Sequence, residues 1–493
     1  MFLDARGVAD GATLDADICI VGAGAAGITI ARELSGGSVS VLVLESGGLR
    51  NDARTQDLAR GEISAHAYPP LESARVRVFG GSTTHWSGWC RPLDPVDFEP
   101  RPAVPYSGWP IDYDDLHVHY TRAQSICQLG PYEYGGRHWA DATAASLLPF
   151  KGGEFETSVF QFSPPTNFGR VYREPLARAR NVRVLLHANA TRIATSENGA
   201  RVERLDVATL SGRRFEVRAR RFVVACGGID NARLLLASDV GEPDGAVGRF
   251  FAEHPHAPVA LAVLPAAVPR VYAGAVAGGT RFRAAIATRA SLVRDQGLLR
   301  SSMTLDPFES DPYVDRQDIR EAETADFGWD VASVLGALEG SAFGIYALYT
   351  RAEQAPNPSS RVTLATERDA LGVPRARLEW RLGELDQRSV ERTVALLGET
   401  LGRTGIGRVF SRPATDRQFL DSVRGGYHHM GTTRMGVDGR TSVVDRQCRV
   451  HGVDNLYIAG SSVFATSGYA NPTLTIVALA LRLAGHLAGK STR

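Results

Sequence analysis

The chain has 493 residues, of which 44% are hydrophobic, and its formal net charge is +1. The length corresponds to about three domain-sized units or to closely interwoven α/β domains with a large core. The near-neutral charge argues against nucleic acid or an anionic membrane surface as the main partner.

The distribution of cysteines and apolar residues bears on where the protein works. Five cysteines are spread along the chain without a C-x-x-C pattern, which predicts free buried thiols and a cytoplasmic, reducing location. The first 16 residues lack a basic segment followed by an apolar run, so no secretion signal is predicted. The apolar run 474–487 is interrupted by Arg482 and His486, which favours a buried helix over a membrane span.

The stretch 17–45 shows the clearest alternation of secondary structure. Residues 18–21 are apolar and mostly β-branched, as in a buried parallel strand. Residues 25–34 carry apolar side chains at helical intervals, and residues 39–44 form a second strand-like run. Residues 1–16 read as a polar surface lead-in, and residues 48–75 as a long excursion without clear periodicity.

Three glycines lie between the first strand and the helix at G-x-G-x-x-G spacing. Gly22 permits the tight turn, Gly24 lets a pyrophosphate approach the backbone, and Gly27 lets the helix pack on the strand. The helix N-terminus offers unpaired N–H groups and a positive dipole end to the phosphates. Glu45, at the end of the second strand, is suited to accept hydrogen bonds from ribose hydroxyls. The alternative is a plain glycine-rich turn, and the motif alone does not separate NAD from FAD.

A later segment repeats this order of strand, glycine turn and helix. Residues 180–228 contain alternating strand-like runs that end at Cys226-Gly227-Gly228 before a helical segment, 229–237, which predicts a return to the nucleotide-binding sheet. Residues 255–415 hold β-type runs and a long helical stretch, and we interpret them as a second domain that roofs the first. A helix is expected after Pro110, with aspartates in its first turn.

Several motifs in this chain resemble the glucose–methanol–choline (GMC) oxidoreductases, in that family's order. They are GAGAAG with Glu45, GGSTTHW, SGWPIDYDDL, VVACGGIDNARLLL, VGRFFAEHP, YHHMGTTRMG and IAGSSVFATSGYANPTLT. Within the family, the chain is most similar to the sugar-oxidising branch of pyranose oxidases and bacterial glycoside oxidases. That branch shares the THW sequence and Gly460, where most members carry an aspartate.

The resemblance implies FAD and a mixed α/β fold of the p-hydroxybenzoate-hydroxylase-like type. A Rossmann-like FAD-binding domain, 1–254 and 416–493, would be interwoven with an antiparallel-sheet substrate domain, 255–415. The positions that the resemblance assigns to the cofactor are Gly22, Gly24, Ala26, Gly27, Glu45, Ser46, Arg77, Gly80, Gly81, Ser82, His85, Trp86, Ala190, Ala225, Gly460, Ser461, Asn471, Pro472 and Thr473.

Alcohol oxidation by hydride transfer needs a base for the hydroxyl proton and a group that holds the oxygen. Histidine has a suitable pKa. The family places this base in an H-x-x-G-T motif and its partner just before a proline, which here are His428 and Asn471. The alternatives are a buried, hydrogen-bonded histidine for His428 and a helix N-cap for Asn471, since Pro472 suits the first helical position.

Other side chains near these motifs have weaker assignments. His429 and Tyr427 are expected to line the substrate pocket. His85 occupies the position that is bonded to the flavin in covalently flavinylated relatives, and both covalent and non-covalent FAD stay open. His254 and His256 lack carboxylate or cysteine partners at ligand spacing, so no metal site is predicted; the resemblance implies a structural role for this histidine position.

The sequence therefore predicts an FAD-dependent oxidoreductase that converts a CH–OH group of a sugar or glycoside to a carbonyl by hydride transfer to flavin N5. The electrons would pass to O₂ or another acceptor. Three alternatives remain: an amino-sugar or aminoglycoside alcohol oxidase or dehydrogenase, a redox-silent FAD-containing lyase, and a non-enzymatic flavin-binding protein. No motif specifies the oligomeric state, the substrate or which hydroxyl is oxidised.

Overall fold

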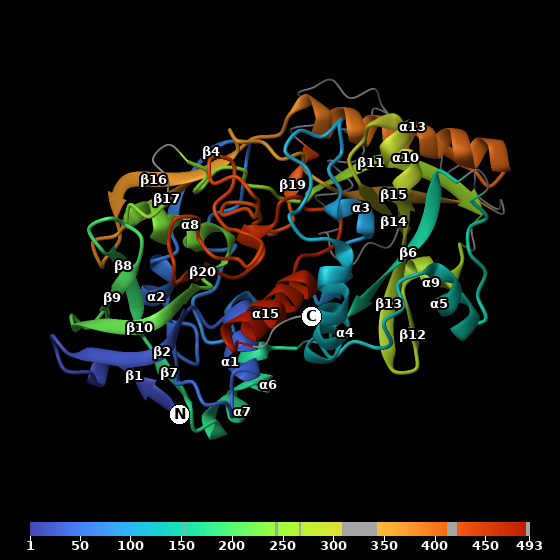
Figure 1. Cartoon of the computed structure of the whole chain (residues 1–493). Helices are drawn as coiled ribbons and strands as arrows, with labels where there is room; N and C mark the ends of the chain where they lie inside the picture. Colours follow the sequence, from blue (N-terminus) through green and yellow to red (C-terminus); the bar gives the residue numbers. More distant parts are fainter. Residues whose placement is uncertain are drawn as a thin grey trace.

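The computed structural model describes residues 1–150, 153–164, 166–241, 245–265, 268–307, 343–411 and 422–489. Figure 1 shows a mostly parallel sheet, built from the N-terminal half of the chain and the late strand β20, and an antiparallel sheet beside it. The helices α4 and α15 lie together between the two sheets. The mixed α/β fold predicted from the sequence is confirmed.

The nucleotide-type sheet has the strand order β1-β7-β3-β2-β10-β9-β8, with β20 paired to β10. Its strands are parallel from β1 to β10, whereas β9 and β8 are antiparallel. The central strands are long apolar runs because both faces of a parallel sheet are covered. The bounds are β1 (Phe2–Asp4), β2 (Thr13–Val21), β3 (Val41–Glu45), β7 (Val182–Leu186), β8 (Asn189–Thr195), β9 (Val202–Ala208), β10 (Arg214–Val224) and β20 (Leu456–Ile458).

This sheet confirms one prediction and corrects another. The segment that ends in Cys226-Gly227-Gly228 does rejoin the sheet, because β10 pairs with β2 in parallel. Residues 1–16 are not a plain surface lead-in. They contain β1, the 3₁₀ helix η1 (Ala5–Gly7) and the first part of β2, whose alternating polar residues hid the strand. Met1 also bonds through its amino group to the Val182 carbonyl.

The antiparallel sheet has the order β18-β11-β15-β14-β13-β6-β5, with β12 on β13 and β19 on β11. One face packs its apolar side chains against helix α13 (Glu384–Thr404), which lies beside this sheet in Figure 1, and the other carries a smaller cluster of Phe160, Ala285, Ala287 and Tyr469. The bounds are β5 (Trp89–Cys90), β6 (Phe155–Phe162), β11 (Pro255–Pro265), β12 (Ala275–Ala277), β13 (Thr280–Thr288), β14 (Ser301–Pro307), β15 (Phe343–Ala352), β18 (Arg408–Phe410) and β19 (Arg424–Gly425).

A small third sheet joins β16 (Arg361–Arg368) and β17 (Pro374–Trp380) to β4 (Gly61–Ala65). The excursion 48–75 therefore has structure that its lack of periodicity did not reveal: helix α2 (Ala53–Asp57) and β4, which pairs in parallel with β17. A five-residue strand with one glycine has too short a pattern to register as alternation. Its partner lies more than 300 residues away in sequence.

The remaining helices fill the space around the sheets. The helix expected after Pro110 is α4, and Asp112 and Asp115 form its capping box. The run 474–487 is the buried helix α15, as predicted. Among the described helices, none combines the length and apolar character that crossing a bilayer requires. The helix bounds are α1 (Ala25–Glu33), α3 (Pro95–Phe98), α4 (Tyr113–Ile126), α5 (Gly136–Ala142), α6 (Phe168–Val171), α7 (Arg173–Arg178), α8 (Gly227–Ala237), α9 (Arg270–Ala273), α10 (Ala290–Gln296), α15 (Thr473–Leu487), η2 (Gly81–Thr84) and η3 (Ser461–Val463).

Candidate active site

A cavity of about 650 Å³ opens at the carboxyl ends of β2, β3 and β10, the edge at which open α/β sheets bind ligands. Gly27 and Gly80 lie outside its wall, and a Cβ at Gly80 would come within 2.7 Å of the Gly169 nitrogen. The other assigned positions all line it: Gly22, Gly24, Ala26, Glu45, Ser46, Arg77, Gly81, Ser82, His85, Trp86, Ala190, Ala225, Tyr427, His428, His429, Gly460, Ser461, Asn471, Pro472 and Thr473.

The glycine loop has the mechanics that its spacing predicts. Gly22 has a φ of +103°, and a Cβ there would lie 2.6 Å from the Ala225 carbonyl oxygen. A Cβ at Gly27 would lie 1.9 Å from the Gly22 oxygen, so helix and strand are in closest contact there. A Cβ at Gly24 would meet no atom within 4 Å. Gly24 thus leaves open space in front of the α1 N-terminus, which has no side-chain cap.

Glu45 braces this loop from the end of β3. Its Oε2 accepts a hydrogen bond from the Ala23 N–H at 2.8 Å, and its Oε1 accepts from the Gly47 N–H at 2.9 Å. Burial raises the pKa of Glu45 to about 7, although both hydrogen bonds and Arg77 act in the opposite direction. Glu45 therefore has two roles: it holds the glycine loop in place, and it forms part of the cavity wall.

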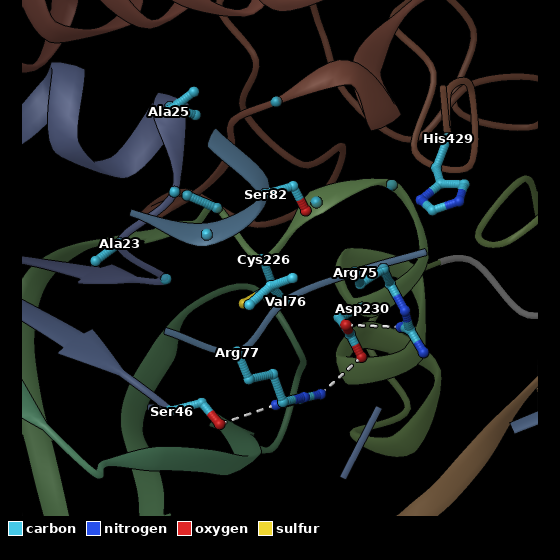
Figure 2. A pocket seen from close by; sticks show the side chains of 18 of the residues that line it. Ala23, Ala25, Ser46, Arg75, Val76, Arg77, Ser82, Cys226, Asp230 and His429 are labelled. Carbon is cyan, nitrogen blue, oxygen red and sulfur yellow. Dashed lines mark hydrogen bonds and ion pairs between the residues drawn. The ribbon is translucent and has the colours of Figure 1, made fainter. Parts of the chain in front are cut away.

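An ion-pair cluster stands across the cavity from the glycine loop (Figure 2). Arg77 donates to Ser46 Oγ at 3.1 Å and to Asp230 Oδ1 at 2.9 Å, and Arg75 donates to Asp230 Oδ2 at 2.7 Å. Burial alone would raise the pKa of Asp230, but these arginines and Arg233 outweigh it and hold the pKa at about 2. The sequence motifs predicted Arg77 as a cofactor-binding residue but gave no signal for Asp230, whose carboxylate holds the Arg77 guanidinium in place.

His428 lies in the middle of a hydrogen-bonded line. Its Nε2 is 3.0 Å from Asn471 Nδ2, and its Nδ1 is 2.8 Å from His254 Nδ1. His254 Nε2 in turn lies 2.9 Å from the Gly468 carbonyl oxygen and 3.3 Å from that of Ser467. The two residues predicted as a catalytic pair are thus in direct contact, and a third residue extends the line.

The partners along this line fix the protons on both rings. Carbonyl oxygens only accept, so His254 Nε2 carries the proton and His254 Nδ1 is an acceptor. His428 Nδ1–H must then donate to it, which leaves the unprotonated His428 Nε2 to accept a hydrogen bond from Asn471 Nδ2. Burial, first of all, and the neighbouring His254, His256 and Arg351 lower the pKa of His428 well below its usual range, so the ring is neutral.

Glu253 supports the loop that carries the base. It is fully buried and accepts hydrogen bonds from the backbone N–H groups of Gly426 and His428, at 3.0 and 2.9 Å, and from Tyr68. Burial raises the pKa of Glu253 to about 7. Glu253 immediately precedes His254, so two adjacent residues hold His428: Glu253 accepts from its backbone N–H, and His254 is bonded to its ring.

The other predicted pocket residues take different positions. His429 is buried, and its Nε2 lies 2.9 Å from the Tyr68 hydroxyl instead of facing Asn471. Tyr427 is 52% exposed and has a φ of +60°, an uncommon conformation for a residue with a side chain. Asn471 is not the N-cap of α15; Pro472 occupies that position. The Asn471 Oδ1 atom is buried without a partner among the described residues.

The contact of His254 with His428 is a second feature of the site that the sequence did not predict. The resemblance implied a structural role for His254, but its ring is bonded to His428. No sequence signal reveals this contact, because 174 residues separate the two histidines. In the described ranges, no group of three or more histidine, cysteine, aspartate or glutamate side chains is arranged to hold a metal ion.

Comparisons with known proteins identify the family. The model of a family described as FAD dependent oxidoreductase matches residues 17–297, more than half of the chain. A second model, described as GMC oxidoreductase, matches residues 356–480, which include the His428 motif. The chain is an FAD-dependent oxidoreductase, and its C-terminal part is similar to the GMC oxidoreductases.

Individual relatives match nearly the whole chain. The 6'''-hydroxyparomomycin C oxidase of Streptomyces lividus is 29% identical and covers 96% of this chain and 92% of its own. The C-glycoside 3-oxidase of Microbacterium trichothecenolyticum is 27% identical, over 97% of each chain. The crystal structure of pyridoxine 4-oxidase from Mesorbium loti aligns with a TM-score of 0.59 at 20% identity, over 95% of this chain and 98% of that one, and shows the same fold.

The cavity of this FAD-dependent oxidoreductase fits FAD on its own features. Its volume suits a large cofactor. The uncapped N-terminus of α1 opens onto it beside Gly24, as a pyrophosphate requires. His428 and Asn471 line the same cavity, and Asn471 Oδ1 is buried without a hydrogen-bond partner among the described residues.

Proposed function

We propose that the enzyme oxidises a CH–OH group of a sugar or glycoside to a carbonyl, with His428 as the general base and Asn471 as the residue that orients the hydroxyl. The observation that carries this proposal is the line Asn471–His428–His254, which leaves an unprotonated Nε2 beside an amide donor at the cavity wall. Full-length relatives named for oxidation of a C-glycoside and of an aminoglycoside support the substrate class.

The residues divide the reaction between them. The substrate hydroxyl replaces the direct hydrogen bond between Asn471 Nδ2 and His428 Nε2, with its oxygen accepting from the amide and its proton pointing at the imidazole. His428 Nε2 takes that proton as the C–H bond breaks. Bound FAD supplies the two-electron acceptor at flavin N5. His254 accepts from His428 Nδ1–H throughout, so the imidazolium that forms is stabilised at its far nitrogen.

The test is a substrate panel on the FAD-loaded enzyme. Sugars, glycosides and amino sugars are mixed anaerobically with the enzyme, and the loss of flavin absorbance is recorded; turnover is then measured with a dye acceptor, with and without O₂. We expect bleaching by neutral sugars or glycosides, and the O₂ arm identifies the acceptor. Substrate conversion without bleaching would contradict the proposal and indicate the lyase alternative.

An amino-sugar alcohol is the second candidate. It is favoured by the similarity to the 6'''-hydroxyparomomycin C oxidase. A cationic substrate requires a carboxylate that is free to pair with it. The acidic residues that line the cavity, Glu45, Asp230 and Asp369, are already bonded within the protein, which disfavours this candidate.

The linkage to FAD is a separate proposal. The exposed His85 ring lines the cavity, and partial desolvation lowers its pKa, so its nitrogen is available as a nucleophile near neutral pH. We propose a covalent bond from a His85 ring nitrogen to the flavin 8α carbon. It would replace one C–H bond of the 8α-methyl group, release two protons and leave two electrons on the flavin, which O₂ or the other acceptor would remove. Acid precipitation should leave the yellow colour in the pellet, and His85→Ala should move it to the supernatant. Release of all FAD from the parent protein would overturn the covalent bond and leave the fold unaffected.

The division of the chain and its location are further parts of the proposal. The FAD-binding domain comprises 1–254 and 416–493, with excursions, and the substrate domain 255–415; the boundary at 415–416 lies outside the described residues. Strands β5 and β6 are excursions that complete the substrate sheet. The five cysteines are free, which supports a reducing, cytoplasmic location. Limited proteolysis followed by mass spectrometry tests the domain boundaries.

A further inference from the structure

Three neighbouring strands of the antiparallel sheet carry a row of polar side chains next to the active site. His256 on β11 is paired with Arg351 on β15, and Arg351 is paired with Ser302 on β14. Residues paired directly across strands share a face of the sheet. Ser302 is also paired with Ala287, which belongs to the cluster of Trp89 and Tyr469 on the active-site side.

The opposite face is apolar, so this row is not a random part of the sheet. The alternate residues Met303, Leu305 and Leu348 pack with α13 in the hydrophobic core of the substrate domain. The Ser302–Arg351–His256 row therefore points away from that core. Its neighbours on the active-site side line the cavity, since Trp89 and His428 are both part of the cavity wall.

Each member of the row has a buried polar atom without a hydrogen-bond partner in the described part of the chain. These atoms are Ser302 Oγ, Arg351 Nη1 and His256 Nε2. Buried polar atoms are nearly always paired in native proteins, so three unpaired ones side by side need an explanation. The guanidinium of Arg351 is instead stacked on Trp89, with its Cζ atom 4.3 Å from the ring centroid.

Among the residues that the structure describes, no carboxylate forms an ion pair with Arg351. A described carboxylate that acts on its pKa, Asp306, already accepts hydrogen bonds from Arg283 and Thr304. The histidines around it, including His256, have pKa values lowered by burial and are neutral. Burial lowers the pKa of Arg351 to about 10, so it stays protonated at neutral pH. A cation without a counter-charge in this position is costly unless a ligand supplies one.

The row lies close to the reacting atoms. The ring centroids of His256 and His428 are 5.8 Å apart. A Cβ on Gly426, which lines the cavity, would touch both rings, at 2.8 Å from His256 Cε1 and 2.9 Å from His428 Nδ1. Ser302, Arg351 and His256 are not themselves part of the cavity wall, so a substrate group that binds the row must extend past the wall beside His428.

We infer that the Ser302–Arg351–His256 row binds an oxyanion, a carboxylate or a phosphate, carried by the sugar substrate. This inference rests on the proposed function, since it names the class of sugar that the same site takes. The guanidinium supplies the counter-charge, and its Nη1, the Ser302 hydroxyl and the imidazole Nε2 supply donors. A cationic amino sugar would be repelled at this position.

The experiment compares matched ligands on the FAD-loaded enzyme. Methyl β-glucoside, methyl β-glucuronide, glucose 6-phosphate and glucosamine are titrated against the flavin absorbance spectrum to measure binding, and anaerobic bleaching is followed separately. Arg351→Gln removes the charge and Arg351→Lys keeps it. Arg281→Gln is the control, because Arg281 also stacks on an aromatic ring of this sheet, Phe162, but is exposed.

We expect an anionic sugar to bind the parent enzyme about 10- to 100-fold more tightly than methyl β-glucoside, the range for one or two charge-assisted hydrogen bonds. Arg351→Gln should abolish this preference, Arg351→Lys should keep part of it, and Arg281→Gln should keep it all. A preference for only one of the two anions would support the row and identify its oxyanion. If Arg351→Gln lowers FAD content, Arg351→Lys and Ser302→Ala, which should weaken anion binding alone, carry the test.

Equal binding of neutral and anionic sugars by the parent, or an unchanged preference in Arg351→Gln, would overturn the inference. These outcomes are distinct from failure of the proposed function. Tight binding of an anionic sugar without bleaching by any ligand would contradict sugar oxidation but would support anion binding by the row. Bleaching by methyl β-glucoside without an anion preference would support sugar oxidation but would contradict anion binding by the row.

Discussion

Asn471, His428 and His254 come from distant parts of the chain, yet their side chains form one hydrogen-bonded line. The terminal carbonyl acceptor, Gly468, sets the proton on His254, which sets the proton on His428. A base is useful only if the lone pair that faces the substrate is free. At the scale of single residues, we therefore propose that His254 is a positioning residue for the proposed base, His428.

The role of His254 gives the first prediction. His254→Ala should slow flavin reduction by the proposed substrate about 10- to 100-fold, because the Nδ1–H of His428 loses its acceptor. His254→Asn should recover part of the rate, since an amide oxygen also accepts a hydrogen bond. Anaerobic stopped-flow reduction at saturating substrate measures this. The control is His138→Ala, a change at an exposed histidine. Equal rates in the Ala and Asn variants, with reduced FAD content in both, would indicate a merely structural histidine.

At the scale of elements, the loop between β2 and α1 carries the cofactor end of the site. Its three glycines do different work: Gly22 and Gly27 allow contact between backbones, and Gly24 leaves space in front of the helix. The order of strand, loop, helix and second strand makes this arrangement local, within about thirty residues.

The second prediction concerns Gly27 in this loop. Gly27→Ala should lower the free energy of unfolding by about 1–3 kcal/mol and reduce FAD retention, because the new Cβ would meet the Gly22 oxygen at 1.9 Å. Gly485→Ala, in the interior of α15, is the matched control, since its Cβ would meet no atom within 4 Å. It should raise stability by about 0.5–1 kcal/mol. Thermal unfolding and FAD content measure both, and equal behaviour of the two variants would contradict the packing argument.

Elements with a local pattern could be predicted from the sequence, and those that depend on distant pairing could not. The 17–45 unit, the capped helix after Pro110 and the buried helix 474–487 each carry their signal within one window. Strands β1 and β4 are short and depend on partners far along the chain, so they escaped prediction. The same holds in the active site. The motif predicted His428 and Asn471, whereas His254 and Asp230 act through contacts that only the tertiary structure creates.

At the scale of the whole molecule, a buried ion-pair cluster joins the segment after α3 to the end of β15. Arg101 donates to Glu353 through both of its terminal nitrogens, and the Arg300 N–H donates to the same carboxylate at 2.9 Å. Glu353 is fully buried. Burial raises its pKa, but Arg101 outweighs burial and the net shift is downward.

The third prediction follows from this cluster. Glu353→Gln should lower the free energy of unfolding by about 3–5 kcal/mol, because Arg101 is left buried without its counter-charge. Since the folded pKa of Glu353 lies below the unfolded value of about 4.3, its stabilisation is present above that pH and is lost as the pH falls through the folded pKa. Thermal scans of parent and variant should therefore converge in acid. Glu174→Gln removes an exposed pair and should leave the melting temperature unchanged; a similar loss in both variants would contradict this account.

The central claim is that His428 removes the hydroxyl proton and Asn471 orients the oxygen, and the pH dependence of anaerobic flavin reduction tests it most directly. Because burial lowers the pKa of His428, the parent rate should fall only at pH values well below about 6.5. His428→Ala should lose about 10² to 10⁴ in rate and regain part of it at high pH, where more substrate is already alkoxide. Asn471→Ala should lose rate without that recovery. Both should keep FAD. Reduction of His428→Ala at the parental rate would contradict the account, and His429 would be the next residue to test.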